Sequence, residues 1–161
     1  QYLKDYKFKT LHPSYRLYNC PLYFQNDWLN ESMKGAYKFV YLGPAGSSTK
    51  LHADVLLSFS WSTNVCGMKR WFLIPPEYTF LLYDCFGQHL APHMHADIYG
   101  SCDFMYPGLP IARSVCLEII QNEGETIFVP SGWHHTVENL KPTLSINHNM
   151  INAENVTWGW K

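Results

Sequence analysis

A succession of short strand-like segments, each bounded by turn residues, most constrains how this chain can fold. The segments are apolar or alternating, and dipeptides such as Gly43-Pro44 and Pro75-Pro76 interrupt them. They comprise residues 37–42, 64–75, 115–120, 126–130, 134–139 and 143–149. Short strands at this spacing predict an all-β dominated domain, a jelly roll or barrel with minor helical elements.

Two other regions are less regular. Residues 77–109 have weak periodicity and several prolines and glycines, so we expect an insertion or long loop over the scaffold. Near the start, residues 21–30 predict an extended piece and a turn, with Asn30 or Ser32 capping a helical turn. At 161 residues we expect a single domain over 1–161, and the start at Gln1 favours a fragment of a longer chain.

Charge and cysteine content narrow the possible partners and compartment. Lys and Arg number 12 against 13 Asp and Glu, so a net charge of -1 predicts no direct nucleic-acid binding and no membrane partner. The chain has an odd number of cysteines and no Cys-x-x-Cys pair. The five cysteines are Cys20, Cys66, Cys85, Cys102 and Cys116. We therefore expect reduced thiols and a cytoplasmic location, with the nucleus as the alternative.

His52-Ala-Asp54 is the first candidate for chemistry. If these residues begin a strand, alternation places both side chains on one face, where they offer an imidazole and a carboxylate to a common point. One further histidine would complete the two-histidine, one-carboxylate triad of non-haem Fe(II) enzymes. His134 and His135 are candidates, but only one of two neighbours faces the cavity, and the turn at Gly132 leaves the choice open.

A second His-x-Asp triplet occurs at His95-Ala-Asp97, near His89 and His93. Such a histidine cluster could bind zinc adventitiously. It has no adjoining strand pattern, however, and no downstream lysine at a comparable place, so we interpret it as a solvated loop.

Lys69 lies on an apolar strand and shares a face with Trp71 and Leu73. Its ammonium would need an anion there, which a dicarboxylate co-substrate would supply, and the Thr49 hydroxyl can donate to the same carboxylate. The alternative is a solvent-facing lysine that snorkels beside the tryptophan.

The last strand carries a polar face. Its members are Thr143, Ser145, Asn147 and Asn149. A polar strand face is usually solvated, but in a barrel it can line a ligand cavity.

Together these motifs resemble the JmjC family of Fe(II)- and 2-oxoglutarate-dependent oxygenases, and most closely its hydroxylase branch. The matching stretches are residues 41–54, 60–71, 128–135 and 145–149, and the resemblance covers nearly the whole chain except residues 77–114. It implies a single JmjC catalytic domain with the double-stranded β-helix of the cupin class.

The resemblance also assigns roles to residues. It implies that His52, Asp54 and His135 bind iron, that Thr49 and Lys69 bind the distal carboxylate of 2-oxoglutarate, and that Asn147 and Asn149 lie near this co-substrate. Ser62 departs from a related arginine-demethylase-like member, which has asparagine there.

The implied activity is hydroxylation of a lysine side-chain carbon in a protein substrate, a translation termination factor, with Fe(II), 2-oxoglutarate and O2. Two alternatives remain open at this point. One is histone lysine demethylation by the same chemistry, and the other is a metal-free or zinc-loaded cupin-like binding module without catalysis.

Overall fold

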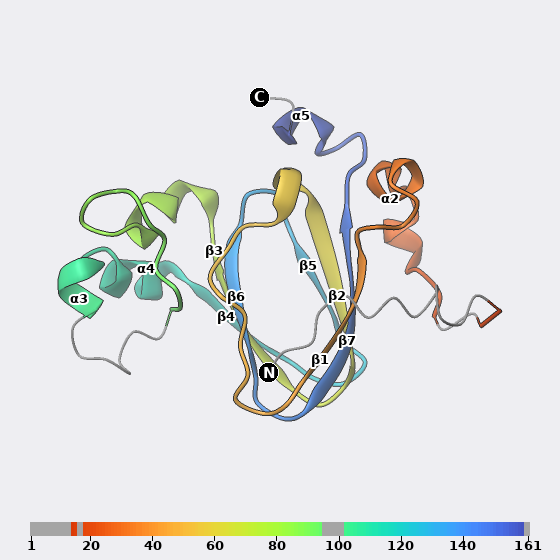
Figure 1. Ribbon diagram of the computed structural model, residues 1–161, viewed down its shortest axis with the longest axis horizontal. Coiled ribbons are helices and arrows are strands. Elements are labelled where there is room, and N and C mark those ends of the chain that lie inside the picture. Colours follow the sequence, from red (N-terminus) through yellow and green to blue (C-terminus); the bar gives the residue numbers. More distant parts are fainter. Residues whose placement is uncertain (1–13, 16–17, 95–101, 160–161) are drawn as a thin grey trace.

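The fold is built from two antiparallel sheets that face each other (Figure 1). A computed structural model describes residues 14–15, 18–94 and 102–159. In the larger sheet the strand order is β1 (Lys38–Gly43), β7 (Thr143–Met150), β2 (Phe59–Cys66), β5 (Thr126–Val129). In the smaller sheet it is β4 (Leu117–Gln121), β3 (Lys69–Ile74), β6 (His134–Asn139). This arrangement confirms the predicted jelly roll.

The apolar core lies in two places. Between the sheets, Trp71 and Val137 of the smaller sheet pack with Ile127 and Val129 of the larger one. A second cluster covers the outer face of the smaller sheet, where Phe72 and other β3 side chains meet two helices. These helices are η3 (Pro76–Leu82) and α4 (Leu109–Val115). The smaller sheet is therefore buried on both faces along β3.

The prediction of a long loop over residues 77–109 is only partly correct, because residues 83–94 form turns and one isolated bridge while helices form on either side of them. Besides η3 and α4, a short helix α3 (Cys102–Met105) forms there. Leu82 and Leu109 are fully buried, and Gly108 approaches so closely that an added Cβ would lie 2.4 Å from the Leu81 carbonyl oxygen. The region is thus packed structure, although the triplet His95-Ala-Asp97 falls outside the described residues.

The single strand predicted over residues 64–75 is instead two strands in different sheets. The chain turns at Gly67, whose φ of +88° suits glycine, and a Cβ there would lie 2.1 Å from the Pro142 carbonyl oxygen. Asn64 fixes the turn because its Nδ2 donates to the Gly67 carbonyl oxygen at 2.9 Å. Val65 is consequently exposed and does not share a buried face with Lys69.

In the described chain, four further short helices lie outside the two sheets and the 76–115 region. They are η1 (Leu22–Phe24), α2 (Trp28–Ser32), η2 (Val55–Leu57) and α5 (Val156–Gly159). Asp27 caps α2, not Asn30 or Ser32 as predicted, because its carboxylate accepts from Asn30 N at 3.1 Å and from Asn30 Nδ2 at 2.6 Å. Across the described ranges, no helix has the length and apolar character needed to cross a membrane.

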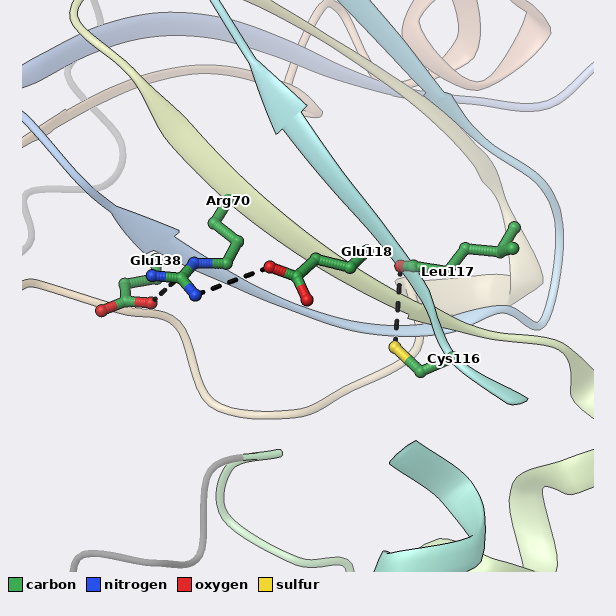
Figure 2. Close-up of polar contacts among 5 residues, drawn as sticks. All are labelled: Arg70, Cys116, Leu117, Glu118 and Glu138. Atoms are coloured by element: carbon green, nitrogen blue, oxygen red, sulfur yellow. Dashed lines mark hydrogen bonds and ion pairs between the residues drawn. The ribbon is translucent and has the colours of Figure 1, made fainter. Parts of the chain in front are cut away.

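Arg70 links the three strands of the smaller sheet through ion pairs on the outer face of that sheet. Figure 2 shows its guanidinium between Glu118 of β4 and Glu138 of β6, at 3.5 and 3.4 Å. The exposed fractions of the Arg70, Glu118 and Glu138 side chains are 32, 54 and 34%. Ion pairs that are screened by solvent in this way contribute little to stability. We expect Arg70→Ala to lower the free energy of unfolding by at most about 1 kcal/mol, measured by urea denaturation. A loss of several kcal/mol would contradict this expectation.

Candidate functional site

His52, Asp54 and His135 meet at one end of the space between the sheets. His52 forms an isolated bridge with His135, in which each backbone N–H donates to the other carbonyl, at 3.1 and 2.8 Å. Asp54 follows in extended conformation, directly before η2. The segment is therefore a single bridge and not the strand start predicted for it. The side-chain ligand atoms of the three residues all lie within 4.8 Å of one another.

The structure resolves the choice between the neighbouring histidines. His135 pairs with Leu73, whose side chain belongs to the core between the sheets. His135 itself is 4% exposed. His134 pairs with Ile74, which packs into the outer cluster. The His134 Nδ1 lies 3.3 Å from the Thr79 hydroxyl instead. Strand alternation thus directs His135, and not His134, to the site.

Backbone carbonyls orient both imidazoles of the triad. His52 Nδ1 lies 2.7 Å from the Lys50 carbonyl oxygen, and His135 Nδ1 lies 3.2 Å from that of Trp133. Because a carbonyl only accepts hydrogen bonds, each Nδ1 carries the proton and each Nε2 keeps its lone pair. Both rings are therefore in the tautomer that a metal ion needs.

The protonation state of His135 favours metal binding as well. Burial lowers the pKa of this imidazole well below its usual range, because the charged form loses its hydration. A neutral imidazole is the metal-binding form. Two imidazole nitrogens and one carboxylate oxygen on one side of a centre fit Fe(II) and leave its other positions open.

Asp54 has a partner that the sequence analysis did not single out. The Ser60 hydroxyl donates to Asp54 Oδ2 at 2.6 Å, and Ser60 is 2% exposed. Ser58, Ser60 and Ser62 are all buried. This alternation of serines through an otherwise aromatic strand was the available signal for a polar, inward-facing row.

The co-substrate side of the site centres on Lys69. It is 1% exposed, and burial lowers its pKa to about 8. The ammonium lies 5.9 Å from the ring centroid of Tyr41, a β1 residue that the sequence analysis missed. Tyr41 pairs with Ser145 of β7, so strand parity was the signal that placed it in the interior. Lys69 therefore lies on a buried face, and the snorkelling alternative is wrong.

The polar face of β7 lines the interior and is not solvated. Its members are all buried: Thr143, Ser145, Asn147 and Asn149. Within the part of the chain that the structure describes, the Ser145 hydroxyl is buried without a hydrogen-bond partner. Burying such groups is costly unless something binds them. A polar ligand between the sheets would meet that requirement.

The remaining predicted residues are held by protein contacts. Thr49 pairs with Val137 of β6, and its hydroxyl oxygen accepts from the Val137 N–H at 2.9 Å, which leaves the hydroxyl proton to donate. Asn149 donates through Nδ2 to the Ser58 hydroxyl at 3.0 Å and accepts from Asn147 at 3.4 Å. Its amide is therefore engaged by neighbours, while Thr49 keeps a free donor.

Comparisons with known proteins agree with this geometry. A family model described as "JmjC domain, hydroxylase" matches residues 39–150. The chain is 47% identical to the 2-oxoglutarate and iron-dependent oxygenase JMJD4 of Danio rerio and 44% identical to that of Homo sapiens. It is 42% identical to the arginine-specific demethylase JMJ20 of Arabidopsis thaliana.

Each of these three similarities covers 99% of the chain. In the other direction, the chain spans only 37 to 39% of the length of these relatives. The similarity therefore concerns the two sheets and the site between them.

Proposed function

Because this chain belongs to the JmjC hydroxylase family, we propose that it forms the catalytic domain of an Fe(II)- and 2-oxoglutarate-dependent oxygenase that hydroxylates protein. The observation that carries this proposal is the convergence of His52, Asp54 and His135 at the end of a buried polar interior, with the Nε2 of each imidazole left to bind a metal. The bound iron would supply the centre at which 2-oxoglutarate is oxidatively decarboxylated. One oxygen atom of O2 then enters succinate and the other enters the substrate.

The protein's own residues would hold the co-substrate. Lys69 is a buried cation of the interior and would pair with the distal carboxylate of 2-oxoglutarate, whose negative charge raises the pKa of the ammonium back toward its usual value. Thr49 and Tyr41 add a hydroxyl donor and an aromatic wall, and Ser145 and Asn147 offer polar groups on β7. This set binds a dicarboxylate and excludes water from around it.

The proposed substrate is a lysine side-chain carbon of a translation termination factor. The resemblance of the motif-bearing residues to the hydroxylase branch supports this choice, and the 44 to 47% identity to JMJD4 oxygenases supports the oxygenase chemistry on which it depends. A cytoplasmic location suits such a substrate. It also suits the thiols of Cys20, Cys66, Cys85 and Cys116, which are all free.

A second candidate is removal of an N-methyl group by the same chemistry. The 42% identity to a relative named as an arginine-specific demethylase favours it. Hydroxylation of a methyl carbon gives an unstable carbinolamine that releases formaldehyde, so the two activities differ only in the carbon presented to the site.

Mass spectrometry separates the two candidates. We expect a termination-factor fragment incubated with the full protein, Fe(II), 2-oxoglutarate and O2 to gain one oxygen atom on an unmethylated lysine. Loss of a methyl group from a methyl-lysine or methyl-arginine peptide, without that gain, would favour the demethylase. Succinate production that persists in a His52→Ala variant would show that the triad is not the site and would favour a binding module.

A further inference from the structure

The carboxylate of Asp54 has two oxygens, and the protein engages one of them. The Ser60 hydroxyl donates to Oδ2 at 2.6 Å from the inward face of β2. We propose that Ser60 is a positioning residue that reserves Oδ2 and so makes Asp54 present the single oxygen Oδ1 to the metal. This inference rests on the proposed function.

The surroundings of Ser60 leave its hydroxyl no better partner. Its cross-strand neighbours are Val129 of β5 and Asn149 of β7. Val129 is apolar, and the Asn149 amide already donates to Ser58 and accepts from Asn147. Ser60 is 2% exposed, so water does not compete freely for it. An ionised carboxylate only accepts, and the proton therefore runs from Ser60 to Asp54.

The main chain that follows Asp54 is held by a contact that does not involve Ser60. Leu56 and Leu57 adopt φ values of 56° and 49°, a conformation that β-carbon-bearing residues rarely hold without support. Ser131, in the loop that leads to His135, supplies that support by donating to the Leu57 carbonyl oxygen at 2.6 Å. The remaining freedom of the ligand is rotation of its side chain about χ1 and χ2, which is the motion that the Ser60 hydrogen bond restricts.

Restricting this rotation preserves the open face of the metal. Two histidines and one carboxylate oxygen leave three of six positions unoccupied. A chelating 2-oxoglutarate would need two of these positions, and O2 would need one. If Asp54 bound through both oxygens, it would occupy one of these positions. The hydrogen bond from Ser60 would thus keep positions on the metal open for the co-substrates.

The test is a calorimetric titration of the apo protein with Mn(II), which needs no turnover. We expect Ser60→Ala to weaken Mn(II) binding by about 10–100-fold, the usual cost of removing a group that orients a metal ligand. We expect Ser60→Thr, which keeps the hydroxyl, to bind within a few-fold of the wild type. Thr63→Ala is the matched control, because Thr63 forms an equally short hydrogen bond of 2.6 Å to Thr126 from the opposite face of β2. It should leave Mn(II) affinity unchanged.

A Mn(II) dissociation constant for folded Ser60→Ala less than about tenfold above the wild type would overturn the inference. If Ser60→Ala does not fold, the Mn(II) dissociation constant of Ser60→Cys is measured instead and judged by the same limit of about tenfold. The cysteine thiol has a similar volume to the serine hydroxyl group but is a weak hydrogen-bond donor. A wild-type protein that takes up no Mn(II) would contradict the proposed function itself. Wild-type binding with unimpaired Ser60→Ala would contradict the inference alone.

Discussion

Replacing His135 with alanine is expected to abolish metal binding, while replacing its neighbour His134 leaves it intact. The two residues have opposite strand parity: only His135 reaches the triad, whereas His134 lies beside Thr79. Changes to groups that merely orient a ligand cost about 10–100-fold in affinity, so loss of a ligand should exceed ~100-fold. The measurement is the visible charge-transfer band that forms when Fe(II) and 2-oxoglutarate are added anaerobically.

Folding must be controlled in this experiment because His135 is buried. Circular dichroism of each variant provides the check. His52→Ala is a second variant at a less buried ligand, and it should lose the band equally. A band that survives in both folded ligand variants would show that iron binds elsewhere.

Replacing Lys69 with methionine is expected to raise the KM for 2-oxoglutarate by at least about 30-fold and, at the same time, to stabilise the apo protein. Truncating one partner of a buried charge pair costs roughly 2–5 kcal/mol of binding. Without the co-substrate, the buried ammonium is a cost to folding, since burial lowers its pKa to about 8 from 10.5. Steady-state kinetics and thermal unfolding of the apo protein measure the two effects. The exposed Lys141→Met is the control and should change neither.

The same lysine predicts a pH dependence with a definite sign. Between pH 8 and 10.5 the unfolded state binds more protons at this residue than the folded state, so the wild-type apo protein should gain stability as pH rises through this window. Binding of 2-oxoglutarate should weaken over the same range because the ammonium loses its proton. An apo Lys69→Met variant with an unchanged pH slope would contradict this assignment.

Strand positions and metal ligands were predictable because both depend on local pattern. Turn residues bound each strand, and β5, β6 and β7 agree with the predicted segments to within a residue. His52 and Asp54 are two residues apart, so the extended chain alone places them on one side. The remote histidine was narrowed to two neighbours by residue type, and the family resemblance then selected His135.

The errors arose where a contact from far along the chain decides the local structure. At the Gly67 turn the Pro142 carbonyl approaches so closely that only glycine fits, a contact that strand periodicity does not reveal. The helices of the 77–109 region form because β3 offers an apolar outer face. Strand parity could place Ser60 and Tyr41 on inward faces, but their roles come from contacts with Asp54 and Lys69 that only the folded structure shows.

The bridge between His52 and His135 also bears on how the protein folds. The bridge joins residues that lie far apart in the chain, as do the pairings of β1 with β7 and of β2 with β5 and β7. Such non-local pairing is slow, and the three ligands converge only once it is complete. Metal should therefore bind the native state in preference to the unfolded chain, and its concentration should shift the melting temperature by mass action. Iron supply would then govern the lifetime of the folded protein as well as its activity.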